Sequence, residues 1–393
     1  MLFKLLSLLF IFNCTTSSRM ADNQTAHGHY RLYSYPEKLA KMNSYEKDRY
    51  KKIVFVSSNN LNGHFAPKSV PVKNRFNENR EIIYGGLAAM KAYQEIFKKT
   101  YDEKVLFVDA GSFLNTEHDQ QKAIFYANYY APDVMALGHT ELINLARVKE
   151  NIFGKLYGHL KVPFVASNLF NLKKAKDMDI KNVRQSYIKS VHNLKVGFIS
   201  TINQSFAAQV NKEMTHLYIQ NETKTILAKA SELRRQGAQI IVLLTTSSID
   251  CNSKIAKEES IDISKVNFDP YESDQCDHYK NNLSKVLAEL PPKSLDLVIA
   301  SGESAKIANF IQNYPVIQNE GQGEFFSWAE IYYDTKHQVV DLGKSKIYQP
   351  VQLCHNFIKS TQDCYVKESI DNQDVSSAFF LGEKVQIKPL PQI

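Results

Sequence analysis

The stretch VLFVDAGSFLNTEHDQQKAIFYANYYAPDVMALGHTEL, residues 105–142, decides the fold prediction. It contains two short apolar runs, Val105–Val108 and Val134–Leu137, and each run stops at a turn of small residues, DAGS and then GHTE. A short apolar run that stops at glycine is typical of a buried strand that leads into a loop. Because open α/β sheets bind ligands beyond the carboxyl ends of their strands, the two turns mark the expected site.

Strands and helices continue to alternate along the rest of the chain. An apolar run at Ile53–Val56 predicts a first buried strand. The next helix has one apolar face with spacings of three and four residues, formed by Leu87, Met90, Tyr93 and Phe97. Further strands are predicted within VPFVASNLF, SYIKSVHNLKVGFIST, IIVLLTTSS and LDLVIASGES. This alternation indicates an α/β domain.

Two later segments predict the remaining elements of this domain. A helical stripe of Ile226, Ala230 and Leu233 stops at Gly237, as helices commonly do. The stretch FFSWAEIYYDTKHQVVDLGKSKIYQ alternates apolar and polar residues, which is the pattern of antiparallel edge strands. We therefore expect the sheet to end in antiparallel strands near residue 350.

Length and charge limit the classes of protein that the chain can belong to. Its 393 residues are enough for one to three domains, and 44% hydrophobic with 23% charged residues is an ordinary globular composition. The net charge is +7, but Lys and Arg form no dense block. Nucleic-acid binding is therefore not indicated.

The N-terminus resembles an export signal. MLFKLLSLLFIFNC has one Lys, an apolar run too short to span a bilayer, and Cys14. We interpret residues 1–13 as a signal peptide, Cys14 as a lipidation site and residues 14–50 as a polar tether. The protein would then be exported and lipid-anchored at the cell envelope, on the periplasmic or the outer surface. Two alternatives remain: a plain secretory signal cut a few residues later, and a cytosolic protein that starts at Met20.

The cysteine count agrees with export. Besides Cys14, the chain has two sequence-local pairs, Cys251 with Cys276 and Cys354 with Cys364. Two disulfides and one lipid anchor would leave no free thiol, which suits an oxidising compartment. Neither pair has the CxxC spacing of a zinc site. We expect the first pair to bound an insertion, residues 251–276.

In order and type, these segments resemble the metallophosphoesterase domain of the 5′-nucleotidase family. The resemblance runs from about Ile53 to about Tyr348 and includes GGLAAMKA at the first helix. It implies a four-layer α/β/β/α sandwich with two mixed sheets over residues 51–350, followed by a C-terminal extension, residues 351–393. It also implies a two-metal site at the strand ends. In the family a second, substrate-binding domain normally follows, and we do not expect one within these 393 residues.

Most of the metal-ligand positions that the resemblance implies hold other residues here. The Asp-x-His loop has Asn60 and Asn62, and the Gly-Asp loop ends in Ser112. In the Gly-Asn-His-Glu loop, His139 replaces the ligand Asn and Thr140 replaces the catalytic His. The later His positions hold Thr246, Gly302 and Ser304.

These substitutions remove the charge that a metal pair needs. Two dications about 4 Å apart repel by roughly 16 kcal/mol at an effective dielectric of 20, and carboxylates and imidazoles must offset that repulsion. Neutral side chains and a glycine cannot do so. The remaining donors, His64, Asp109, His139 and Glu141, could form a displaced single-metal site, but His64 and His139 are more simply explained as ordinary polar residues. In the family this first Asp is not the bridging ligand, so we expect Asp109 to shape its turn by accepting backbone N–H groups.

We therefore expect an exported protein with a 5′-nucleotidase-like fold that is catalytically inactive and contains no cofactor. It would act by binding a protein partner or a nucleotide-like ligand, with membrane contact only through the lipid anchor. The alternative is an active phosphoesterase with a rearranged site that holds Mn²⁺, Zn²⁺ or Mg²⁺. A third hypothesis is a structural envelope protein whose strand-end cleft is filled by side chains.

Overall fold

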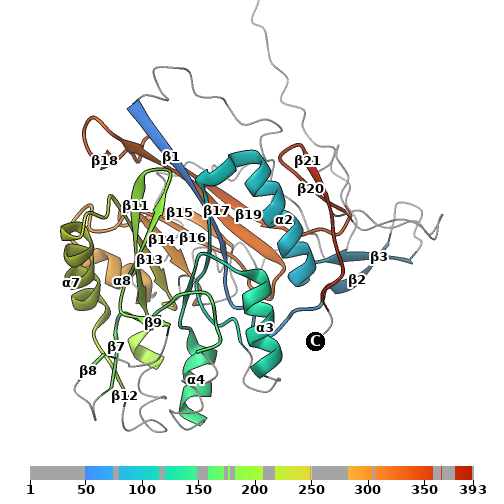
Figure 1. Cartoon of the computed structure of the whole chain (residues 1–393), viewed down its shortest axis with the longest axis horizontal. Coiled ribbons are helices and arrows are strands. Elements are labelled where there is room, and N and C mark those ends of the chain that lie inside the picture. Colours follow the sequence, from blue (N-terminus) through green and yellow to red (C-terminus); the bar gives the residue numbers. More distant parts are fainter. Residues whose placement is uncertain are drawn as a thin grey trace, which may run out of the picture.

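The strands of the chain form two large sheets that pack face to face. The computed structural model describes residues 49–73, 79–114, 120–147, 158–171, 176–177, 182–206, 217–247, 249, 282–302, 306–356, 364 and 377–391. Figure 1 shows α2 and α3 on one side of the paired sheets and α7 and α8 on the other. The predicted four-layer α/β/β/α sandwich with two mixed sheets is confirmed.

The first sheet has the strand order β18-β17-β1-β4-β5-β6-β9, and β19 also pairs with β17. The strands β1, β4, β5, β6 and β9 run parallel, whereas β17 runs antiparallel to β1, β18 and β19. Its strands are β1 (Tyr50–Ser58), β4 (Val105–Asp109), β5 (Val134–Ala136), β6 (Phe164–Val165), β9 (Val183–Arg184), β17 (Phe325–Asp334), β18 (Val339–Val340) and β19 (Lys346–Gln352).

The second sheet has the strand order β10-β11-β13-β14-β16-β15. Its central strands β11, β13, β14 and β16 are parallel, and antiparallel strands close both edges. Its strands are β10 (Tyr187–Val191), β11 (Leu194–Thr201), β13 (Ile240–Thr245), β14 (Leu297–Ala300), β15 (Ile307–Ile311) and β16 (Tyr314–Gln318). The predicted pairing within SYIKSVHNLKVGFIST is the β10–β11 hairpin.

Smaller strand groups and the helices complete the described structure. The helices are α2 (Gly86–Tyr101), the 3-10 turn η1 (Asp102–Lys104), α3 (Gln120–Tyr130), α4 (His139–Arg147), α7 (Glu222–Arg235) and α8 (Asn282–Ala288). The remaining strands are β2 (Lys68–Lys73), β3 (Asn79–Tyr84), β7 (Leu169–Asn171), β8 (Lys176–Asp177), β12 (Leu217–Ile219), β20 (Ser377–Phe380) and β21 (Glu383–Gln386).

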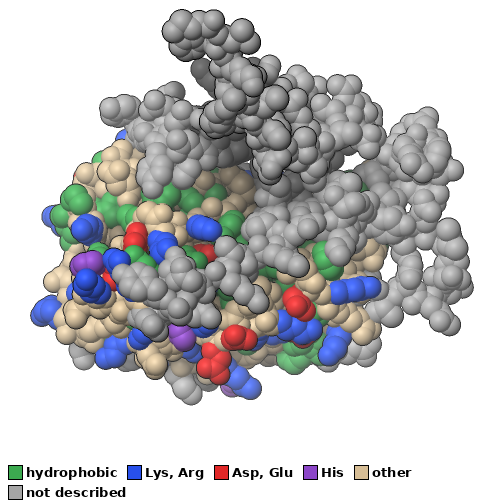
Figure 2. Space-filling view, turned by 90° about the horizontal axis from the view of Figure 1, so that it is seen from above, with side chains coloured by type: hydrophobic (Ala, Val, Ile, Leu, Met, Phe, Trp, Pro, Cys, Tyr) green, Lys and Arg blue, Asp and Glu red, His purple; other side chains and the backbone are tan. Residues whose placement is uncertain are grey.

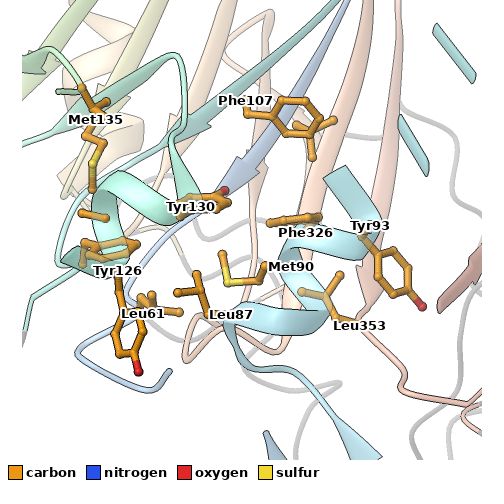
Figure 3. Close-up of a cluster of buried hydrophobic side chains, with 14 of the residues drawn as sticks. Leu61, Leu87, Met90, Tyr93, Phe107, Tyr126, Tyr130, Met135, Phe326 and Leu353 are labelled. Atoms are coloured by element: carbon orange, nitrogen blue, oxygen red, sulfur yellow. The ribbon is translucent and has the colours of Figure 1, made fainter. Parts of the chain in front are cut away.

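Alternate residues of β1 enter two different cores. Ile53 and Phe55 face the second sheet, whereas Val54 and Val56 face the side covered by α2 and α3. Successive side chains of a strand point to opposite faces, so a sheet buried on both sides needs an unbroken apolar run. A third core packs α7 and α8 against the second sheet. Figure 3 shows the core beneath α2 and α3.

Local sequence signals set the ends of α7 and the start of α2. Asn221 caps α7 because its side chain accepts a hydrogen bond from the backbone N–H of Lys224. The chain leaves α7 through Gly237, whose φ is 89°. Gly85, with φ of 71°, precedes α2, and a β-carbon there would lie 2.9 Å from the carbonyl oxygen of Gly323. Only glycine fits that approach without strain.

The strand β17 lies inside its sheet and not at an edge, so the prediction of edge strands is wrong for it. Every residue of β17 is buried, and the strand lies between β1 and the pair β18 and β19. Its buried acid Glu330 finds partners inside the protein. Glu330 accepts hydrogen bonds from the hydroxyls of Tyr101 and Tyr332 and pairs with Lys52. The alternation therefore reflects internal hydrogen bonding and not a solvated face.

The C-terminal residues contribute to the core on the α2 side. The hairpin β20–β21 packs against α2 and buries Ala378, Phe380, Val385 and Ile387. The predicted disulfide between Cys354 and Cys364 is present. The predicted pair Cys251 and Cys276, the signal peptide, Cys14 and the N-terminal tether lie outside the described residues. None of the described helices is long and apolar enough to cross a membrane.

We expect Phe326→Ala to destabilise the fold by about 3–5 kcal/mol, because it removes a fully buried ring from this core. The matched control is Phe125→Ala on α3, where the ring is 38% exposed and the loss should stay below about 1 kcal/mol. Urea unfolding of both variants measures the difference. Equal losses would contradict the assignment of Phe326 to the core.

Candidate functional site

The loops that follow β1 and β4 are joined along their backbones. The N–H groups of Asn60, Asn62 and Gly63 donate to the carbonyl oxygens of Gly111, Ser112 and Phe113 at 2.9, 2.8 and 3.0 Å. Asn60, Asn62 and Ser112 have positive φ angles of 47°, 48° and 58°. Left-handed conformations at residues other than glycine cost energy and cluster at functional sites. The carboxyl ends of β1 and β4 thus meet in one tightly ordered pair of loops.

The carboxylate of Glu141 holds the second of these loops to the loop after β5. Oε2 accepts hydrogen bonds from the N–H groups of Ser112 and Gly138, both at 2.9 Å, and Oε1 accepts one from Leu114 at 2.8 Å. The side chain is fully buried. Burial raises the pKa of Glu141, and the three N–H donors oppose that rise. Both oxygens are therefore engaged by the protein backbone.

Gly111 and Gly138 let the two loops touch backbone to backbone. A β-carbon on Gly138 would lie 2.0 Å from the backbone nitrogen of Ser112, and one on Gly111 would lie 2.8 Å from the Cα of Gly138. The hydroxyl oxygen of Ser112 accepts a hydrogen bond from the N–H of His139 at 3.1 Å. No side chain fits between the loops at this point.

Asp109 shapes the turn at the end of β4, as the sequence predicted. Its Oδ1 accepts the N–H of Gly111 at 3.0 Å, and its Oδ2 accepts the hydroxyl of Ser58, which also contacts the hydroxyl of Tyr130 at 3.0 Å. The carboxyl is fully buried. Burial raises the pKa of Asp109 to about 8, against the opposing hydrogen bonds from Ser58 and Gly111.

Ser301 connects the strand ends of the two sheets. The side-chain nitrogen of Asn60 donates to the carbonyl oxygen of Ser301 at 2.7 Å. The hydroxyl of Ser301 donates to the carbonyl oxygen of Ala110 at 2.8 Å. It also lies 3.2 Å from the backbone carbonyl oxygen of Thr245. Gly302 follows directly, half-buried, whereas Ser304 lies outside the described residues.

A second buried carboxylate, Glu222, organises the end of β13. It accepts hydrogen bonds from the hydroxyls of Ser247 and Thr201, at 2.8 and 3.1 Å, and lies 3.5 Å from that of Thr245. Burial raises its pKa, against these hydrogen bonds. Thr246 next to this cluster accepts the N–H of Asn203 at 2.9 Å. The role of Glu222 was not predicted from the sequence. The one local signal was its position directly after Asn221, the residue that caps α7.

His139 is neutral and packed against an aromatic ring. Its imidazole stacks on Phe206 with 4.0 Å between the ring centres. Burial lowers the pKa of His139 to about 4. Three buried polar atoms on these loops have no hydrogen-bond partner in the described part of the chain: Nε2 of His139, Oγ1 of Thr140 and Oδ1 of Asn62. Unpaired buried polar atoms are uncommon in native proteins and call for an explanation.

The remaining predicted donor, His64, does not join this group. Its side chain is exposed, and its Nδ1 lies 3.0 Å from the carbonyl oxygen of Leu61. Asp109 and Glu141 use their oxygens within the loops. Among the described residues, no three His, Cys, Asp or Glu side chains are placed together to hold a metal ion.

Solved structures with the same architecture place the chain in a known fold. The NAD nucleotidase of Haemophilus influenzae is 14% identical with a TM-score of 0.53, over 78% of this chain and 51% of that chain. A putative 5′-nucleotidase from Staphylococcus aureus is 16% identical with a TM-score of 0.55, over 82% and 56%. The calcineurin-like phosphoesterase of Bacillus subtilis is 11% identical with a TM-score of 0.55, over 77% and 91%.

This chain has the metallophosphoesterase fold. No protein-family model and no curated protein sequence matches it at a significant level. The chain spans about half the length of the two nucleotidase structures. Within the metallophosphoesterase fold, the loops after β1, β4 and β5 are the place where the resemblance puts the first metal ligands. The structure brings Asn60, Asn62, Ser112 and His139 together there.

We expect Glu141→Gln to destabilise the protein by about 2–3 kcal/mol. Glutamine offers one oxygen to three N–H groups and turns its own NH₂ toward them, which leaves buried donors unpaired. The matched control is Glu95→Gln on the exposed side of α2, where almost no change is expected. Urea unfolding compares the two, and an unchanged stability of the Glu141 variant would refute the bridging role.

The buried carboxyl of Asp109 should make stability fall as pH rises. Its folded pKa of about 8 lies above the ordinary value of 3.8, so between these pH values the folded state holds a proton that the unfolded chain has released. The free energy of unfolding then falls by about 1.4 kcal/mol per pH unit from this group. Asp109→Asn should remove that contribution between pH 5 and 7, measured by urea unfolding at each pH. Asp102→Asn, at an exposed position, should leave the slope unchanged, and an equal slope in both variants would contradict the assignment.

Proposed function

We propose that this chain is a metallophosphoesterase-fold protein that does not hydrolyse phosphate esters and acts by binding. The observation that carries the proposal is the hydrogen bonding of the strand-end loops. Both oxygens of Glu141 bind backbone N–H groups, and the Asn60 side chain donates to Ser301. In this arrangement the loops are held together by the protein itself.

The residues at these loops do not fit a pair of metal ions. Asn60, Asn62 and Ser112 carry no charge, and His139 offers a single neutral nitrogen, Nε2, without a partner in the described residues. A two-metal centre needs several anionic or imidazole donors to offset the repulsion between dications. A bridging carboxylate in particular is missing, because its position is held by Ser112. We therefore derive no hydrolytic step at this site.

The unpaired atoms favour a small ligand with hydrogen-bonding groups. Nε2 of His139, Oγ1 of Thr140 and Oδ1 of Asn62 are buried on adjacent loops beside the stacked rings of His139 and Phe206. Each buried polar atom left unpaired costs about 1–3 kcal/mol, which a bound hydroxyl or amide would recover. A nucleotide-like ligand combines such groups with a ring that can stack on an aromatic side chain. A protein partner is the other binding mode that the sequence leaves open.

Location is part of the proposal. The apolar run before Cys14 supports export with a lipid anchor at that cysteine, which would hold the domain at the cell envelope. The disulfide between Cys354 and Cys364 supports an oxidising compartment. Mass spectrometry of the membrane fraction would detect the lipidated cysteine.

The deciding experiment measures metal and turnover in the purified protein. We expect elemental analysis to find no stoichiometric Mn, Zn or Mg, and we expect no hydrolysis of AMP or bis(p-nitrophenyl) phosphate with added Mn²⁺ or Zn²⁺. Stoichiometric metal, or turnover that His139→Ala abolishes, would establish the active phosphoesterase instead. A variant with Asn60→Asp, Asn62→His, Ser112→Asp, His139→Asn and Thr140→His tests whether the family's donors restore metal binding.

Binding is tested on the same preparation with adenosine and AMP in the presence of EDTA. Isothermal titration should show binding that His139→Ala weakens by about tenfold, because one hydrogen bond and one stacked ring are lost. The control His337→Ala lies on the β17–β18 turn and should bind as the parent protein does. If neither compound binds, the nucleotide-like ligand is excluded and the protein partner remains.

A further inference from the structure

A cavity of about 620 Å³ opens at the opposite end of the strands from the loops described above. It is bordered by the starts of β1, β13 and β14 and by the turn after β17, through Lys51, Gln239, Asp296 and Thr335. Volumes of about 300–1,000 Å³ are typical of ligand sites. The lining is polar, and it combines residues from both large sheets. The two large sheets therefore form this cavity together, and it is separate from the strand-end loops.

The acid at this cavity is already neutralised. Asp296 pairs with the guanidinium of Arg234 at 2.6 Å, and the same oxygen accepts the N–H of Ile241 at 2.7 Å. Arg234 also donates to the carbonyl oxygen of Ala238. Arg234 and Asp296 thus contribute no net charge, and their hydrogen bonds fix the wall between α7 and β14.

Three lysines at the cavity have no acidic partner in the part of the chain that the structure describes. Lys51 and Lys293 line it, and the ammonium group of Lys195 lies beside Gly237, 3.6 Å from where a β-carbon would stand. The ammonium group of Lys51 donates a long hydrogen bond of 3.5 Å to the carbonyl oxygen of Asn193. Two of these charges line the hollow and the third lies beside Gly237 at its border. Such a group attracts anions more strongly than isolated surface charges do.

Figure 2 looks onto the end of the molecule where β1 begins, and it shows Lys and Arg side chains with some Asp and Glu side chains among them on the described part of this face. Neutral donors are also present in the cavity, from the side-chain amides of Gln239 and Gln338. Lysine binds phosphate as a point charge, and amide and hydroxyl groups add direction.

We propose that this cavity binds a phosphate-bearing anion through Lys51, Lys195 and Lys293. The ligand is a phosphate ester or pyrophosphate group with at least two negative charges. Such a group can come from a soluble compound or from a lipid headgroup at a membrane surface. The proposal does not depend on the strand-end loops, and it holds whether or not those loops bind a nucleotide-like ligand.

The test compares two double charge reversals in the full chain. Lys195→Glu with Lys293→Glu changes the cavity, whereas Lys224→Glu with Lys285→Glu makes the same change of net charge on the outer helices α7 and α8. All four side chains are exposed, so none of the changes disturbs a core. Circular dichroism and the urea midpoint confirm that both proteins fold.

Isothermal titration with pyrophosphate at low salt measures binding of a soluble phosphate compound, which is the soluble arm of the test. Sedimentation with phosphatidylglycerol–phosphatidylcholine vesicles, compared with phosphatidylcholine vesicles alone, measures binding of an anionic lipid headgroup, which is the lipid arm. We expect the cavity variant to bind at least tenfold more weakly in one arm, and the control variant to change less than twofold. Loss for pyrophosphate identifies a soluble phosphate, and loss for anionic vesicles alone identifies a lipid headgroup. Absence of binding in both arms, or equal losses in the two variants, overturns the proposal.

Discussion

The strand-end region depends on Glu141, whose carboxylate accepts hydrogen bonds from three backbone N–H groups. It joins the loop after β4 to the loop after β5 at a point where Gly111 and Gly138 leave no room for a side chain. A buried carboxylate with three good donors rigidifies its surroundings, whereas one with missing donors would be costly. The loops thus keep a defined shape through hydrogen bonds within the chain.

The same principle recurs at the end of the second sheet and within the first. Glu222 is surrounded by threonine and serine hydroxyls, and Glu330 by tyrosine hydroxyls and a lysine. In each case hydrogen-bond donors converge on a buried carboxyl group and offset part of the cost of its burial. Lysine side chains without an acidic partner among the described residues lie elsewhere, at the opposite end of the strands, where Lys51 and Lys293 line a hollow and Lys195 lies beside Gly237 at its border. The two ends of the sandwich therefore differ in chemical character.

Local patterns predicted much of the fold because they reflect local physics. The apolar run of β4, the helix face around Leu87 and Met90 and the β10–β11 hairpin all appear as expected. The turn at Asp109 also follows from its own sequence. The position of β17 inside the sheet could not be predicted from its sequence. An alternating pattern looks the same whether its polar residues face water or partners inside the protein. Those partners, such as Tyr101 for Glu330, lie far away in the chain.

The strand-end loops were predictable from the sequence, but the hydrogen-bond network within them was not. Two apolar runs that stop at glycine turns predicted β4, β5 and the loops that follow them. The roles of Glu141 and Glu222 depend on distances between loops, which spacing along the chain does not contain. The cavity at the other end of the strands was also invisible in the sequence, because its lysines come from three separate segments. Sequence shows which residue types are available, and only the fold shows which of them meet.

The pairing of β1 with β17 has a consequence for synthesis of the protein. Arg49, next to β1, bonds Asp334 at the end of β17 across 285 residues, and β1 is flanked on one side only by that late strand. A ribosome adding about 5–20 residues per second needs roughly 15–60 s to cover such a distance. During that time the edge of β1 opposite β4 has no partner strand. The first sheet is therefore incomplete until β17 has been synthesised, and it can be completed only after synthesis has passed residue 334, late in the chain.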